Sequence, residues 1–120
     1  MCIRDRFLYS AASHNPHRIH YDRAYAEFEG HADILVHGPL QGSWLTQYLS
    51  DWCGPRGRLL GVSWQNRASA LPETELEFHG TVTAVDGTTG TVELDVWEQT
   101  AAGEVLMPGS ARVMLPTSHP

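Results

Sequence analysis

Two polar groups in the first third of the chain carry residues that could do chemistry. The first runs from Ser13 to Asp22 and reads Ser-His-Asn-Pro-His-Arg-Ile-His-Tyr-Asp. The second, His37-Gly38-Pro39, comes just ahead of a predicted helix. Imidazole titrates near neutral pH and can move protons, and the free N–H groups at a helix start favour negative charge on an oxygen. Together the two groups indicate acid–base chemistry on a polarised carbonyl.

Histidine spacing also raises a metal site as an alternative. His14, His17 and His20 are three residues apart, which suits one face of a helix. The Asn15-Pro16 pair interrupts a helix at this point, and no cysteine or acidic ligand accompanies the histidines convincingly. We therefore predict no metal.

Length and composition bound the possible functions. The chain has 120 residues, 42% of them hydrophobic, which is enough for one small domain. A net charge of −6 argues against a nucleic-acid partner. No apolar run approaches the roughly 20 residues of a membrane span, and the N-terminus lacks the apolar core of a secretory signal. With only Cys2 and Cys53, neither a disulfide framework nor a zinc site is expected, and we predict a cytoplasmic protein without a membrane partner.

Local signals divide the chain into helices followed by strands. Residues 1–6 are expected to be a non-native or disordered N-terminus, 7–116 the domain, and 117–120 a tail. Helices are predicted from Phe7 to about Ser13, after a cap at Asp22 to Phe28, and from Pro39 to Cys53, where Gly54-Pro55 ends the last helix. The short apolar run Ile34-Leu35-Val36 is predicted to be a strand. Further strands are predicted at 59–65, 75–84, 92–96 and 111–115.

The long helix carries the clearest pattern. Apolar side chains form a broad stripe along it, at Leu40, Trp44, Leu45, Tyr48, Leu49 and Trp52. This width predicts burial against a sheet, with Trp44 and Trp52 as core residues. The turns at Asp86-Gly90 and Ala102-Gly103 predict hairpins. The fold class is therefore α+β, with one long helix on a curved antiparallel meander of about four strands.

The run from Tyr9 to Ala26, with the helix opened by His37-Gly38-Pro39, resembles the MaoC-like dehydratases of the hot-dog fold. It is most similar to the branch of mesaconyl-CoA and itaconyl-CoA hydratases and 3-hydroxyacyl-thioester dehydratases. The resemblance covers roughly residues 7–115. It implies a sheet wrapped around one long central helix, with the first strand of that fold missing. It also implies reversible hydration and dehydration of an enoyl or 3-hydroxyacyl thioester, carried on coenzyme A or acyl carrier protein, with no other cofactor.

Family members place a histidine near His20, usually with an upstream aspartate, and use the N–H at the position of Gly38 to hold the thioester oxygen. Here Asn15 stands at the aspartate position in a gapless alignment, and Ser13 stands there if Asn15-Pro16 is aligned. The expected carboxylate is absent, which puts a two-residue proton relay in doubt.

The resemblance and the chemistry of the side chains together assign a role to each candidate residue. His20 is the acid–base, and the Gly38 N–H is the donor to the developing negative oxygen. Asn15 orients water or the substrate hydroxyl, because a carboxamide does not protonate usefully. The remaining candidates are substrate contacts, namely His17, Arg18, His37 and Pro39. His17 is also a candidate for a second proton carrier, and Arg18 is a candidate partner of a ligand carboxylate or phosphate. A structural alternative exists for His37, which can simply close a strand.

Two other functions stay open. A hot-dog thioesterase shares the helix-end device but commonly uses an aspartate or glutamate near the long helix, and Gln41 and Gln47 offer no carboxylate there. A non-catalytic hot-dog half, serving as a binding or structural partner, is the second alternative. Either way, exposed sheet edges predict a homodimer or pairing with a second hot-dog domain.

Overall fold

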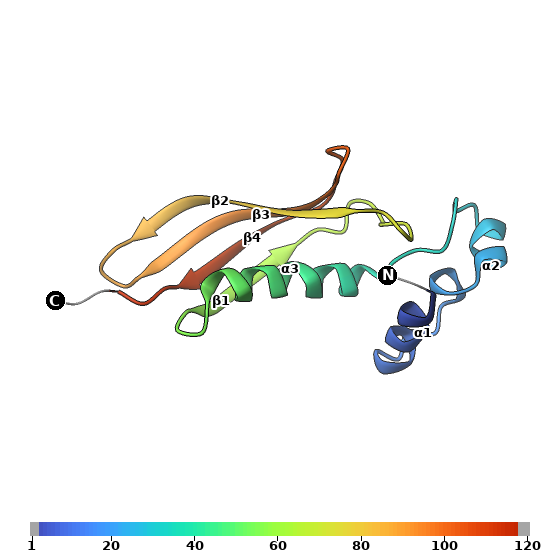
Figure 1. The fold of residues 1–120 in the computed structure, drawn as a ribbon, viewed down its shortest axis with the longest axis horizontal. Coiled ribbons are helices and arrows are strands. Elements are labelled where there is room, and N and C mark those ends of the chain that lie inside the picture. The colour runs from blue at the N-terminus through green and yellow to red at the C-terminus, as the bar shows by residue number, and fades with distance from the viewer. Residues whose placement is uncertain (1–2, 118–120) are drawn as a thin grey trace.

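The computed structural model describes residues 3–117 as helices followed by a four-stranded sheet (Figure 1). The helical part comprises α1 (Ile3–Ala12), the 3-10 helix η1 (Arg18–His20), α2 (Arg23–Phe28) and α3 (Gly38–Cys53). The strands are β1 (Arg58–Trp64), β2 (Leu76–Asp86), β3 (Thr91–Thr100) and β4 (Val105–Met114). The predicted α+β class and element order are confirmed.

All neighbouring strands pair antiparallel, in the order β1-β4-β3-β2. The hairpins join β2, β3 and β4 into the predicted meander. β1 departs from it, because it pairs with β4 and not with its successor β2. Residues 65–75 cross from one edge of the sheet to the other without forming a strand. The prediction of a simple four-strand meander is therefore wrong at β1.

The core lies between the sheet and α3 (Figure 1). Along β3 the buried side chains alternate with exposed Glu93 and Asp95, so one face of the strand points at the helix. The helix contributes Leu45, Leu49 and Cys53, and the sheet contributes Val92, Leu94, Val96, Met107, Ala111 and Val113. Burying each large apolar side chain stabilises the fold by roughly 1.5–3 kcal/mol. This packing fixes the position of α3.

The ends of α3 follow their local signals. His37 is the N-cap, and Gly54, at φ 73°, ends the helix while its N–H bonds the Ser50 and Asp51 carbonyls. The predicted stripe is buried at Leu40, Leu45 and Leu49. Trp52 is 44% exposed, so its predicted core role is wrong.

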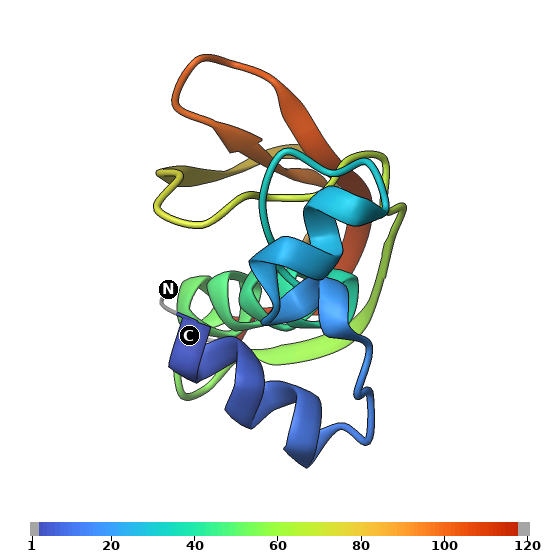
Figure 2. The ribbon, with the colours of Figure 1, turned by 90° about the vertical axis from the view of Figure 1, so that its right-hand side faces the viewer.

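The helices α1 and α2 gather at the end of the molecule where α3 begins (Figures 1 and 2). The expected boundary between residues 6 and 7 falls inside α1, while Met1, Cys2 and residues 118–120 lie outside the described residues. The domain limits stay a prediction.

The predicted strand at Ile34-Leu35-Val36 is wrong. The segment lacks a strand ladder: its Leu35 N–H bonds the Ile19 carbonyl and its Val36 N–H bonds the Ala70 carbonyl. These two bonds tie η1 and the 65–75 connection to the start of α3. Among the described residues, every helix is too short or too polar to cross a bilayer.

Candidate active site

The start of α3 presents unpaired main-chain N–H groups. His37 occupies the N-cap with φ −61° and ψ 134°, and its side chain makes no capping hydrogen bond. The first bond within the helix runs from the Gln41 N–H to the His37 carbonyl, at 3.0 Å. The N–H groups of Gly38 and Leu40 therefore have no partner inside the helix, and Pro39 has none to offer. With the helix dipole, this end favours an oxygen that carries negative charge.

His20 lies against this helix start. Its ring stacks on the His37 ring, with centroids 3.8 Å apart and planes inclined by 19°. Its Nδ1 lies 2.9 Å from the Leu35 carbonyl oxygen. Because a carbonyl only accepts, Nδ1 carries the hydrogen and Nε2 keeps its lone pair. Burial lowers the pKa of His20, although the bond to Leu35 opposes this and the nearby His17 adds to it. The result is a neutral imidazole with a basic Nε2.

His37 has no exposed surface. Its Nε2 lies 2.8 Å from the Ser10 hydroxyl, and Tyr9 contacts its ring edge-on with centroids 4.6 Å apart. Its Nδ1 is buried without a hydrogen-bond partner in the described part of the chain. Burial lowers the pKa of His37 to about 4, so the ring stays neutral at physiological pH. His37 therefore forms a fixed, uncharged surface under the His20 ring.

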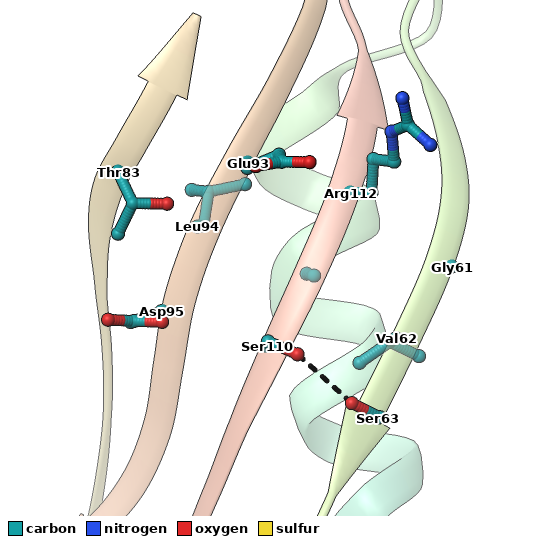
Figure 3. Close-up of a pocket in the computed structure, with 10 residues that line it drawn as sticks. Gly61, Val62, Ser63, Thr83, Glu93, Leu94, Asp95, Ser110 and Arg112 are labelled. Atoms are coloured by element: carbon teal, nitrogen blue, oxygen red, sulfur yellow. Dashed lines mark hydrogen bonds between the residues drawn. The ribbon is translucent and has the colours of Figure 1, made fainter.

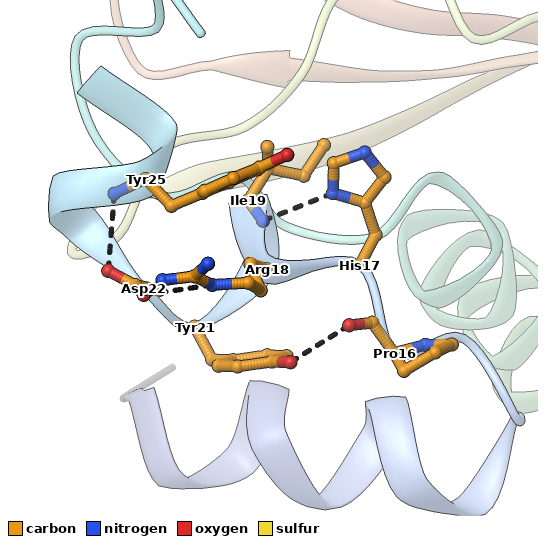
Figure 4. A network of polar contacts seen from close by, with 7 residues as sticks. All are labelled: Pro16, His17, Arg18, Ile19, Tyr21, Asp22 and Tyr25. Carbon is orange, nitrogen blue, oxygen red and sulfur yellow. Dashed lines mark hydrogen bonds and ion pairs between the residues drawn. The ribbon is translucent and has the colours of Figure 1, made fainter. Parts of the chain in front are cut away.

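The exposed half of the motif forms a separate polar network (Figure 4). Arg18 forms an ion pair with Asp22, at 2.6 Å, and its guanidinium lies 4.5 Å from the centre of the Tyr25 ring. Asp22 also accepts from the Tyr25 N–H and so caps α2, as predicted. The His17 Nδ1 accepts from the Ile19 N–H at 3.3 Å and caps η1. These contacts satisfy Arg18 and Asp22 with one another and with Tyr25.

Asn15 is half-buried in the turn between α1 and η1. Its main-chain N–H bonds the Ser10 carbonyl at 2.9 Å, while the Ser10 hydroxyl bonds His37. Ser10 thus connects Asn15 to the stacked rings. The structure brings His20, His37 and Gly38 together, with Asn15 linked to them through Ser10. Pro39 lies exposed beside Gly38.

A buried carboxyl group, that of Glu98 on β3, contacts α3 one turn beyond the helix start. The Gln41 amide donates to Glu98 Oε1 at 2.8 Å and accepts from the Ala70 N–H at 3.4 Å. Glu98 and Gln41 have no exposed surface, and Glu98 Oε2 has no partner within the described region. Burial raises the pKa of Glu98, although the bond from Gln41 partly offsets this. The group is therefore held toward its neutral form.

Sequence reasoning missed both Ser10 and Glu98. The Ser10–His37 bond spans 27 residues and has no local signal. Glu98 did have a local signal in the sequence, because it continues the buried alternation of Val92, Leu94 and Val96 along β3.

A shallow groove of about 450 Å³ lies on the opposite face of the sheet from α3 (Figure 3). Polar side chains line it, among them Glu93, Asp95 and Arg112, and the Ser63 and Ser110 hydroxyls lie 3.0 Å apart. None of the candidate residues borders this groove. The groove is therefore separate from the candidate residues at the start of α3.

Comparison with known proteins decides the family. Residues 4–71, more than half of the chain, match the sequence profile of hydroxyacyl-thioester dehydratase type 2. The chain belongs to this family. The matched range of this dehydratase-family chain contains η1, α2, α3 and all of α1 except its first residue, and it includes His20 and Gly38. The predicted resemblance is confirmed.

One curated relative is similar to the chain over a short stretch. The mesaconyl-C(4)-CoA hydratase of Chloroflexus aurantiacus is 57% identical over 35 residues, which cover 28% of this chain and 12% of that protein. The family chain thus corresponds to a small part of its relative's length.

Solved structures establish the hot-dog fold of this family member. An (R)-hydratase from A. caviae, involved in PHA biosynthesis, superposes with a TM-score of 0.85 at 24% identity, over 95% of this chain and 87% of that one. The ChsH1-ChsH2 complex from Mycobacterium tuberculosis superposes with a TM-score of 0.81 at 20% identity, again over 95% and 87%. At these identities the likeness is one of fold.

Proposed function

We propose that this chain catalyses the reversible hydration and dehydration of an enoyl or 3-hydroxyacyl thioester, with coenzyme A or acyl carrier protein as the carrier. Membership of the hydroxyacyl-thioester dehydratase type 2 family supports the reaction. The contact between His20 and the residue that precedes α3 supports its location. The reaction needs acid–base groups and an oxygen site, and no cofactor beyond the carrier.

In the dehydration direction, the lone pair of His20 Nε2 removes the proton from the carbon next to the thioester carbonyl. Negative charge develops on the thioester oxygen, where the Gly38 N–H and the helix dipole stabilise it. The imidazolium then returns its proton to the departing hydroxyl, so one water leaves and His20 is neutral again. Asn15 is assigned to orient that hydroxyl. Hydration is the same path in reverse.

The fixed orientation of the His20 ring carries this proposal. The Leu35 carbonyl holds the Nδ1 hydrogen, and the neutral His37 ring lies against one face. Both contacts come from the segment that leads into Gly38. A base that is held by the segment carrying the oxygen site keeps its separation from that site, which is what positioning of a reacting group requires.

The test compares His20→Ala with His17→Ala in hydration of crotonyl-CoA, followed by the loss of enoyl absorbance. Loss of a positioned acid–base group lowers rates by about 10²–10⁴, and we expect this for kcat/KM of His20→Ala. His17→Ala, which removes an exposed ring from the same motif, should stay within about threefold, because no acid–base step passes through it. Undiminished turnover by His20→Ala would remove His20 from the mechanism.

Among the candidate substrate contacts, the geometry supports Pro39 most, because it is exposed next to Gly38. The His17 Nδ1 accepts from the Ile19 N–H and caps η1, so we assign His17 to the fold of this segment. His37 is fully buried and cannot contact a substrate, so we revise its role from substrate contact to support of the His20 ring. Arg18 already pairs with Asp22, so we assign it to the fold of the η1–α2 segment.

The thioesterase alternative gains one observation, since Glu98 supplies a carboxyl beside the start of α3, whereas the helix's own carboxylate, Asp51, lies near its other end. A thioesterase base must be ionised and reach water, whereas Glu98 is fully buried and its pKa is raised. We therefore keep the hydro-lyase proposal. Glu98→Gln should retain crotonyl-CoA hydration. Release of free thiol from crotonyl-CoA or butyryl-CoA, abolished in Glu98→Gln, would favour the thioesterase.

We further propose that the chain pairs with a second copy or a second hot-dog domain in the cytoplasm. β2 is a terminal strand of the described sheet, and it exposes Val82 and Val85 by 46% and 67%. An open edge with apolar side chains favours strand pairing. Light scattering should report a dimer that Val85→Lys weakens. A monomer without thioester affinity would instead support the non-catalytic half.

A further inference from the structure

Two glycines of α3, one turn apart, face the end of β1 and the chain that follows it. A Cβ built on Gly38 would lie 1.7 Å from Asn66 Nδ2, and one on Gly42 would lie 2.2 Å from the Trp64 ring. Either distance is far below van der Waals contact. The two side chains therefore pack directly against the helix backbone, where only glycine leaves room.

Main-chain bonds on both sides hold Asn66 in place. The Gln65 N–H bonds the Pro108 carbonyl at 2.9 Å, and the Arg67 N–H bonds the Leu106 carbonyl at 3.0 Å. In extended chain, alternate side chains point to the same side, so Asn66 shares the helix-facing side with Trp64. The carboxamide is thus directed at Gly38 by an anchored backbone.

The donor and acceptor groups of the Asn66 carboxamide are unused within the described part of the chain. It is exposed, and it makes no hydrogen bond to any part of the chain that the structure describes. Its amide group lies against Gly38, whose main-chain N–H has no hydrogen-bond partner among the described residues. Two donors from distant segments, one main-chain and one side-chain, therefore meet at Gly38.

We propose that Asn66 is a catalytic residue, which contacts the thioester and donates a second hydrogen bond to its carbonyl oxygen beside the Gly38 N–H. This inference rests on the proposed function and names a residue that the motif does not contain. Two donors stabilise the developing charge on that oxygen more than one does. The same contact requires glycine at position 38, because any side chain there would displace the carboxamide.

The kinetic test compares Asn66→Ala, Asn66→Asp and Gln65→Ala in crotonyl-CoA hydration. Removal of one oxyanion donor lowers kcat by up to about 10²–10³, so Asn66→Ala should lose about 10- to 100-fold. Asn66→Asp should lose more, because a carboxylate repels the charged oxygen. Gln65→Ala is the matched control, an exposed neighbour on the other side of the chain, and should stay within about twofold. A fully active Asn66→Ala would overturn the inference.

A vibrational measurement separates this inference from the proposed reaction. In the His20→Ala background, the carbonyl stretch of bound crotonyl-CoA should shift to lower frequency, because hydrogen bonds polarise the carbonyl. The added Asn66→Ala change should remove much of that shift, and an unchanged shift would refute the Asn66 contact. A wild-type chain that binds crotonyl-CoA without hydrating it refutes the proposed function alone, since the shift still tests Asn66. A chain that binds no thioester refutes both.

Discussion

His17 and His20 stand three residues apart in one motif, yet the structure gives their rings opposite arrangements. His17 is exposed, and its Nδ1 accepts a hydrogen bond from the Ile19 N–H (Figure 4). His20 is 8% exposed, and its Nδ1 bonds the Leu35 carbonyl. In neutral His17 the hydrogen therefore sits on Nε2, while in His20 it sits on Nδ1.

This difference shows that the backbone partner, and not the residue type, decides which imidazole can act as a base. The Ile19 N–H uses the lone pair of His17. The Leu35 carbonyl instead leaves the lone pair of His20 free, and the buried His37 ring fixes the plane. The exposed half of the motif stabilises η1 and α2, and the buried half provides the chemistry. The predictions below test this division.

The largest expected effect is a loss of stability at acidic pH, caused by the buried His37 ring that stacks on His20. The pKa of folded His37 is about 4, below the unfolded value near 6.5, so the unfolded chain binds protons first as the pH falls. The stabilisation is complete above pH 6.5 and is lost toward pH 4, by roughly 3 kcal/mol. Urea unfolding between pH 7 and 4 measures it.

His37→Asn should flatten that pH dependence, because it removes the buried titrating ring. His17→Ala should keep the wild-type profile. Equal pH dependence in His37→Asn and wild type would contradict the assignment of this effect to the buried stack.

A smaller effect is expected from Ser10→Ala, which removes the partner of His37 Nε2. Neither ring nitrogen of His37 would then be bonded, and an unsatisfied buried polar group costs about 1–3 kcal/mol. The free energy of unfolding should fall by that amount, and kcat should fall with it as His20 loses its fixed support. Ser13→Ala is the matched control, because its exposed hydroxyl bonds the nearby Tyr9 carbonyl and not His37. A larger loss in Ser13→Ala than in Ser10→Ala would reverse the comparison.

The smallest effect is expected from the exposed ion pair. Asp22→Asn keeps an N-cap for α2 but removes the charge that pairs with Arg18. Exposed pairs contribute little, so Asp22→Asn and Arg18→Ala should lower Tm less than Ser10→Ala and leave KM for crotonyl-CoA nearly unchanged. A large rise in KM for Arg18→Ala alone would restore Arg18 as a substrate contact.

Much of the fold could be predicted because its signals are local. The Asp22 cap, the Gly54 stop and the turn at 86–90 each act within a few residues, and each is confirmed. The position of β1 beside β4 could not be predicted in this way, because pairing between distant strands leaves no short-range pattern.

The residues of the candidate site show the same difference between local and long-range signals. His20 and Gly38 belong to short motifs that the sequence displays. The contacts Ser10–His37 and Asn66–Gly38 join segments far apart in the chain, and neither serine nor asparagine stands out in its surroundings. The neutral state of His37 also depends on burial, which only the folded chain defines.

The most direct test of the central claim is the protonation state of His20, read from the ¹⁵N chemical shifts of its ring nitrogens between pH 5 and 8. We predict a neutral ring at pH 7 with the hydrogen on Nδ1, an unprotonated Nε2, and a midpoint below 6.5. A His20 that carries its hydrogen on Nε2, or that is already cationic at pH 7, would contradict its role as the base.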